Sequence, residues 1–295
     1  MKKYIFFTIA LCMINCSKNN SKNKIEINNY YIQKIENERK ERDERRVKYL
    51  KISGLFKLNK TNYLNLDQND KLYVSNSKLN TTIGKIEIEK KEVKFISKSE
   101  EKITNKKNNI IKLKKLELNK IGDSEMLFYK NFSWRIITRS NELYIRIWDE
   151  DNPAVKEFQS FENYEINPNL IFNANFKYYK SSQFKTVDSK LGIKDITNFI
   201  GEIEFEYLGK NYFLEVGENG WIMVGDYTNG DTTYGSGRYL YIDLPEKDGK
   251  CLIDFNYLYN PPCSYSDYTT CLFPSLKNRL PIKIEAGELF KFKNY

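Results

Sequence analysis

The residues best suited to binding a charged ligand lie between positions 234 and 288. Arg238 follows Gly235 and Gly237 in the run Tyr-Gly-Ser-Gly-Arg-Tyr-Leu. Glycines let a backbone approach a ligand closely and leave N–H groups free for an anion, and a guanidinium binds a carboxylate or phosphate through two hydrogen bonds. We therefore predict a backbone anion site at Gly235 and Gly237, with Arg238 beside it. The alternative is a tight turn in which Arg238 forms a structural ion pair with Asp254.

A second polar group follows in Asp254, Asn256 and Asn260. Asp254 and Asn256 share one face if the strand that contains Asp254 continues. A carboxylate with two amides can bind a cation or a polar ligand, whereas Asp and Asn near prolines often hydrogen-bond their own loop. One hypothesis is therefore a structural or binding module in which Arg238, Asp254, Asn256 and Asn260 hold a small polar or anionic ligand. The other is a hydrolase-like enzyme with Asp254 as the base and Arg238 stabilising an oxyanion.

The chain contains no histidine. This excludes Ser-His-Asp and Cys-His catalysis and any metal site that uses histidine ligands. Proton transfer near neutral pH would need a perturbed carboxylate, lysine, tyrosine or cysteine. The sequence shows no cofactor motif, and we predict neither a cofactor nor a metal.

The N-terminus has the pattern of a secretory leader. Lys2 and Lys3 precede an apolar run that ends just before Cys16, and this run is too short to cross a bilayer as a permanent helix. A cysteine in this place resembles a bacterial lipobox, although Asn15 replaces the usual small residue. We predict a signal peptide over 1–15, acylation of Cys16 and a polar tether over 16–27. The protein would then be anchored to membrane lipid in the cell envelope, with the outer membrane favoured. An ordinary signal peptide cut near Cys16 is the alternative.

Cysteines also occur in the C-terminal part of the chain, at positions 251, 263 and 271. Seven residues separate Cys263 from Cys271, in a loop rich in Tyr, Ser and Thr. In an oxidising compartment we expect these two to form a disulfide that stabilises the fold by about 2–3 kcal/mol. Two thiolates of a metal site are the alternative.

The formal net charge is +9, from 48 basic and 39 acidic residues. The basic residues are scattered among the acidic ones, and no nucleic-acid-binding motif is present. We therefore expect no nucleic-acid partner.

The elements that must position these residues are mainly strands. The dense charges of residues 28–49, which interleave in sign at helical spacings, predict a charged helix. Its thin apolar stripe indicates a solvated spacer. Short alternating or aromatic-rich runs then recur to the end of the chain, which is typical of antiparallel β structure. We predict a mainly β protein with two sandwich- or barrel-like halves, 50–148 and 149–295, after the charged helix.

The C-terminal motifs together resemble the bacterial family named domain of unknown function 1684. The matching pieces occur in the family's order, and they are 234–240, 254–256, 259–263, 278–281 and 286–288. The stretch from Arg146 to Pro153 is similar to the mid-chain signature of the family. The resemblance covers about positions 143 to 288, and with the leader it implies a bacterial lipoprotein of this family. The family has no established activity, so the resemblance implies no reaction.

Overall fold

The computed structural model describes residues 27–90, 92–98 and 100–291. The predicted signal peptide, Cys16 and nearly all of the predicted tether lie outside these residues. Within them the protein is mainly β, with antiparallel sheets in a sandwich-like arrangement after one long N-terminal helix, as predicted.

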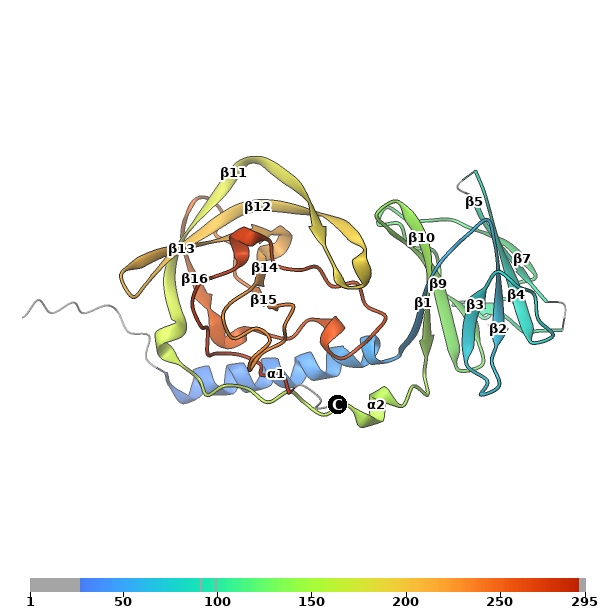
Figure 1. Cartoon of the computed structure of the whole chain (residues 1–295), viewed down its shortest axis with the longest axis horizontal. Coiled ribbons are helices and arrows are strands. Elements are labelled where there is room, and N and C mark those ends of the chain that lie inside the picture. The colour runs from blue at the N-terminus through green and yellow to red at the C-terminus, as the bar shows by residue number, and fades with distance from the viewer. Residues whose placement is uncertain (1–26, 91, 99, 292–295) are drawn as a thin grey trace, which may run out of the picture.

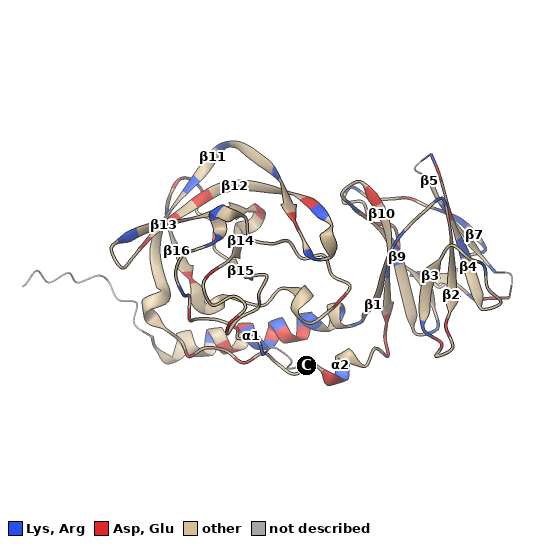
Figure 2. Cartoon of the chain, in the orientation of Figure 1, with Lys and Arg blue, Asp and Glu red and all other residues tan. Residues whose placement is uncertain are grey.

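The helix α1 spans Asn29–Leu50. Asn28 caps its N-terminus, because the Asn28 side chain accepts a hydrogen bond from the Tyr31 backbone N–H at 2.9 Å. Acidic and basic side chains alternate along its middle (Figure 2), and Glu38 pairs there with Arg42 and Arg45 one and two turns later.

Residues 52–149 form two five-stranded antiparallel sheets. One has the order β3-β2-β4-β5-β7 and the other β1-β10-β9-β8-β6. The strands are β1 (Ile52–Lys57), β2 (Thr61–Leu66), β3 (Leu72–Ser75), β4 (Thr82–Glu89), β5 (Glu92–Ser97), β6 (Thr104–Asn105), β7 (Leu113–Leu116), β8 (Leu127–Tyr129), β9 (Phe132–Arg139) and β10 (Glu142–Asp149).

These two sheets enclose a common core. Phe95 from one sheet lies against Trp134 from the other, with ring centroids 5.8 Å apart. Residues alternate between the faces of a strand, so Arg135 and Arg139 point away from the core that buries Trp134. The outer face of β9 and β10 therefore carries arginines together with Ile137 and Trp148, and it is turned away from the sandwich interior.

The remaining chain forms a second β region with its own core. A four-stranded sheet has the order β13-β12-β11-β16, and a two-stranded ribbon pairs β14 with β15. The elements are α2 (Ala154–Glu157), β11 (Ile171–Asp188), β12 (Lys194–Tyr207), β13 (Lys210–Gly217), β14 (Trp221–Val224), β15 (Arg238–Tyr241) and β16 (Gly249–Asp254). Short 3-10 turns are η1 (Pro168–Leu170), η2 (Lys190–Gly192), η3 (Glu218–Gly220), η4 (Phe255–Tyr257), η5 (Pro262–Ser264) and η6 (Leu276–Asn278).

Helix α1 packs against this second β region, although it precedes the first in sequence (Figure 1). Ile35 and Leu50 are buried, and so is Arg46, which bonds to Glu288. The prediction of a solvated spacer is therefore wrong. The helix docks through a few apolar side chains and through ion pairs. The ion pairs compensate for the thin apolar stripe.

Candidate functional site

Arg238 lies in a closed network. Its side chain is 0% exposed and forms an ion pair with Asp226 at 3.0 Å. Its two terminal nitrogens also donate to the backbone carbonyls of Ile284, at 2.8 Å, and of Ala286. The structure thus pairs Arg238 with Asp226 and not with Asp254. A guanidinium held in this way cannot turn toward a ligand. Arg238 therefore cannot donate to a bound anion or to an oxyanion, although the sequence predicted both roles.

The glycines before Arg238 serve this enclosure. Gly237 has a φ of +87°, and a Cβ at that position would lie 2.8 Å from the carbonyl oxygen of Val224. Only glycine fits such a left-handed, crowded position without strain. Gly237 therefore allows β15 to start against β14, whereas Gly235 is not enclosed in this way. The predicted backbone anion site is replaced by a tight turn.

Asp254, at the end of β16, forms a hydrogen bond with the start of α1. It accepts a hydrogen bond from the Tyr31 hydroxyl at 2.5 Å and two from Asn256, each at 2.9 Å. Asn256 in turn bonds the backbone of Asn167 at 2.8 and 3.1 Å. Burial raises the pKa of Asp254, and the donors on Tyr31 and Asn256 oppose that rise. Asp254 and Asn256 thus share a network, as their spacing predicted, and its partners are protein groups.

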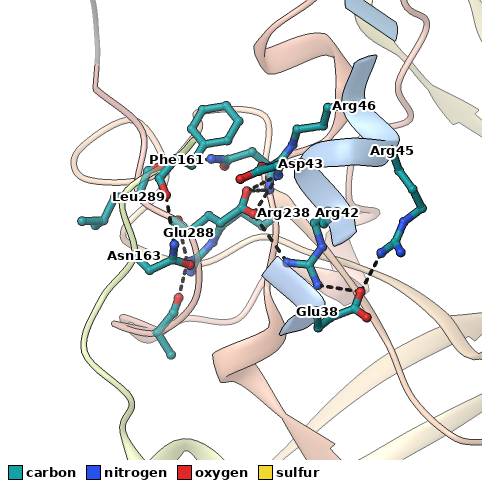
Figure 3. Close-up of polar contacts among 12 residues, drawn as sticks. Glu38, Arg42, Asp43, Arg45, Arg46, Phe161, Asn163, Arg238, Glu288 and Leu289 are labelled. Atoms are coloured by element: carbon teal, nitrogen blue, oxygen red, sulfur yellow. Dashed lines mark hydrogen bonds and ion pairs between the residues drawn. The ribbon is translucent and has the colours of Figure 1, made fainter. Parts of the chain in front are cut away.

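Asn260 belongs to a different network, centred on Glu288. Figure 3 shows Glu288 with Arg42 and Arg46 of α1. Its backbone N–H donates to Glu288 at 2.8 Å, and its side chain donates to the carbonyl of Leu289 at 2.8 Å. Arg46 donates to both carboxylate oxygens of Glu288, at 2.7 and 2.6 Å, and Arg42 reaches the same carboxylate at 3.5 Å. Glu288, which Asn260 holds in place, therefore binds helix α1.

The described residues contain no disulfide, since Cys251, Cys263 and Cys271 are all free thiols. The predicted Cys263–Cys271 bond is therefore absent from this structure, but the two residues are adjacent. The Cys263 backbone N–H lies 3.0 Å from the Cys271 sulfur, and a hydrogen bond from the Cys271 thiol lowers the pKa of Cys263.

A large cleft lies between α1 and the two β regions. Its volume is about 1450 Å³, and its walls come from α1, from the outer face of β9 and β10, and from β14, β15 and β16. Asp254 and Cys271 reach this cleft, whereas Arg238, Asn256 and Asn260 do not line it. Most of the polar residues singled out in the sequence thus lie behind the surface of the cleft, and other residues line it.

The most basic part of the cleft is formed by Arg135, Arg139 and Arg146, here called the arginine cluster. Arg135 and Arg146 are directly opposite each other in the β9–β10 register, and Arg139 lies four positions further along β9. Arg135 pairs with Asp123 at 2.9 Å, and its guanidinium lies 5.6 Å from the Trp148 ring centroid. The cluster thus gathers three guanidinium groups against one paired carboxylate.

Arg146 differs from its neighbours because it is only 8% exposed and, within the part of the chain that the structure describes, has no hydrogen-bond or ion-pair partner. Burial, together with the positive charges of Arg139 and Arg135, lowers the pKa of Arg146 to about 10, and the negative charge of Asp123 opposes this shift. A buried cation without an anion is costly. The cluster therefore presents positive charge to the cleft that protein groups compensate only in part.

Sequence reasoning missed this cluster. Arg146 was noticed only as part of a family-like stretch, and Arg135 and Arg139 were not noticed at all. A usable signal was present: two basic residues four positions apart on one face of a strand whose other face carries Trp134 and Ile136. The pairing of that strand with the one containing Arg146 depends on the register of the hairpin.

The described ranges contain neither a cluster of metal-ligating residues nor a membrane-spanning helix. No group of three or more Cys, Asp or Glu residues there could hold a metal ion. No helix there is long and apolar enough to span a membrane.

Comparison with known proteins identifies the C-terminal region. Residues 156–289 match the model of the family described as protein of unknown function (DUF1684), so the predicted resemblance is confirmed there. No curated protein matches the chain. A solution NMR structure of an uncharacterized protein of Haloarcula marismortui is similar, with 20% identity, a TM-score of 0.40, and coverage of 47% of this chain and 80% of that chain. The C-terminal region of this chain is therefore similar to the family described as protein of unknown function (DUF1684).

Proposed function

We propose that this chain is an exported, lipid-anchored lipoprotein of the cell envelope that binds a small anionic ligand at the arginine cluster. The leader and Cys16 support export and anchoring, since they have the pattern of a lipoprotein signal. The site of binding differs from the one that the C-terminal motifs predicted, because the side chain of Arg238 is enclosed.

The observation that carries the binding proposal is the unpaired guanidinium of Arg146. An anion beside it would supply the missing negative charge and accept hydrogen bonds from its planar fork of donors. Such charge-assisted hydrogen bonds contribute about 1.5–3 kcal/mol each. Arg135 is already aligned by Asp123 and Trp148, so it loses little side-chain freedom when the ligand binds.

Thermal unfolding of the full chain in detergent tests this binding. Phosphate, sulfate, citrate and a sugar acid are each added at equal ionic strength to wild type, Arg146→Met and Arg279→Met. Arg279 is an exposed arginine outside the cleft, so its substitution removes the same charge elsewhere. At least one anion should raise the midpoint of wild type and Arg279→Met but not that of Arg146→Met. Equal shifts in all three proteins, or none in any, would contradict the proposal.

The anchor is tested separately. Metabolic labelling with a fatty-acid analogue should mark the wild-type protein and Cys251→Ala, and Cys16→Ala should abolish the label. Three acyl chains on one cysteine would hold the protein firmly, because each buried methylene contributes about 0.8 kcal/mol. Equal labelling of Cys16→Ala would refute the anchor.

A further inference from the structure

We infer that the ligand of the cleft is an acidic oligosaccharide, held by its acidic end at the arginine cluster and by its sugar rings on an aromatic platform. This inference rests on the proposed function, because it assigns a ligand class to the same site. The platform is formed by Trp221 and Tyr241, which are directly opposite each other on β14 and β15.

The platform is rigid and open to the cleft. Tyr241 is 57% exposed, and Tyr259 stacks against it with an interplanar angle of 5°. Tyr239 contacts Trp221 edge-on, at a centroid distance of 5.0 Å. Large aromatic rings that remain accessible in a cleft while their neighbours fix them are flat apolar surfaces with little freedom to lose. The C–H faces of sugar rings are complementary to such surfaces.

The cleft is also long. Residues of α1 from Tyr30 to Tyr49 line it, which corresponds to about 28 Å at a rise of about 1.5 Å per residue. Its volume of about 1450 Å³ exceeds the roughly 300–1,000 Å³ of most small-molecule pockets. A free inorganic anion at the arginine cluster would therefore leave most of the cleft empty, whereas an oligosaccharide would fill it.

The lining of the cleft combines charged groups with hydrogen-bond acceptors for the hydroxyl groups of a sugar. The arginine cluster lies near the C-terminal end of α1, because Trp148, which lies against Arg135, donates to the carbonyl of Lys48 at 3.1 Å. Toward the other end, the lining side chains on α1 include the amides of Gln33 and Asn37 and the carboxylates of Glu38 and Glu41, interspersed with Lys34, Arg42 and Arg45. The amides and carboxylates accept hydrogen bonds from hydroxyl groups. The platform lies between these ends, because Tyr259, stacked on Tyr241, has the Arg42 guanidinium 4.6 Å from its ring centroid.

The test measures binding of three probes to the full chain in detergent by titration calorimetry: an oligogalacturonide, galacturonate alone, and a neutral malto-oligosaccharide of equal length. Each is titrated into wild type, Arg146→Met, Tyr241→Ala and Tyr227→Ala. Tyr227 is a matched control, since it is 63% exposed and does not line the cleft. We expect the oligogalacturonide to bind at least about tenfold more tightly than galacturonate, and Tyr241→Ala to remove most of that difference. The neutral sugar should bind more weakly than the oligogalacturonide.

The outcomes separate this inference from the proposed function. If galacturonate and the oligomer bind equally, or if Tyr241→Ala behaves like Tyr227→Ala, the saccharide assignment is overturned. Binding of galacturonate that is lost in Arg146→Met still supports an anion site in that case. If no probe binds and no anion stabilises the protein, both the inference and the proposed function fail.

Discussion

Arg46 on α1 and Glu288 near the end of the described chain form a buried ion pair, in which one guanidinium nitrogen lies 2.7 and 2.6 Å from the two carboxylate oxygens. Both side chains are almost completely enclosed, with 3% and 2% exposure. The pair joins residues 242 positions apart, so the helix that follows the predicted tether becomes part of the wall of the C-terminal region. This contact, together with Tyr31 and Asp254, fixes one side of the cleft.

Breaking the Arg46–Glu288 pair should destabilise the protein strongly. Arg46→Met leaves the Glu288 carboxylate buried without its main partner, and we expect a loss of about 3–5 kcal/mol in the free energy of unfolding, measured by urea denaturation. Arg45→Met is the control, because Arg45 is 52% exposed and its pairs with Glu38 and Glu41 lie at the surface. Its cost should be below about 1 kcal/mol. Equal losses of unfolding free energy in the two variants would show that the buried pair does not stabilise the docking of α1.

Arg238 should behave as a structural residue. Asp226→Asn leaves the buried guanidinium of Arg238 without its counter-ion, and we expect unfolding at lower urea, with a loss of about 3–5 kcal/mol. Binding of anions to the folded protein, measured well below the unfolding midpoint, should stay close to wild type. A variant that keeps its stability but loses anion binding would return Arg238 to the functional site.

Asp254 should give the stability a defined pH dependence. Its pKa in the folded protein is raised, so the folded state takes up this proton before the unfolded state as the pH falls. The contribution of Asp254 to stability therefore increases on acidification through the folded pKa toward the unfolded value of about 3.9, and is lost as the pH rises. Asp254→Asn lacks this proton. In urea denaturation, wild type should gain stability relative to Asp254→Asn between about pH 7 and about pH 4.5. A difference that is constant with pH, or of opposite sign, would exclude this role.

The Cys263 and Cys271 thiols should form a disulfide on exposure to an oxidising envelope compartment. Their contact requires little backbone movement, and closing this short loop should stabilise the protein by about 2–3 kcal/mol. Peptide mapping of the unreduced protein after exposure to an oxidant should find the two cysteines linked. Cys251 is the internal control and should remain alkylatable, although burial raises its pKa to about 11 and slows the reaction. Alkylation of all three cysteines would contradict the prediction.

Local patterns predicted the β class and many strand positions, because alternating burial leaves a period of two in the sequence. They failed where strands extend beyond the core. Strand β11 begins with an aromatic-rich run that ends at Tyr179 but continues to Asp188, and the residues of this extension are mostly exposed and polar. Pairing with β12, for example Gln183 with Phe199, holds this extension, and such pairing leaves no local signal.

The site was harder to predict than the fold for a related reason. Arg238 and Asp254 lie in recognisable motifs, but only the tertiary structure shows that Arg238 faces Asp226 in a closed core. The arginine cluster depends on the β9–β10 register, which places Arg146 opposite Arg135. Likewise, the docking of α1 depends on Glu288, a partner too distant in sequence to be inferred from the charge pattern of the helix.

The most direct test of the central claim is to locate a bound anion. Crystals of the protein soaked in selenate, an analogue of sulfate and phosphate with an anomalous signal from selenium, should show selenium within hydrogen-bonding reach of the Arg146 guanidinium in wild type and Arg279→Met. The peak should disappear in Arg146→Met. Selenate that binds only elsewhere, or that keeps its place in Arg146→Met, would contradict the assignment of the arginine cluster as the anion site.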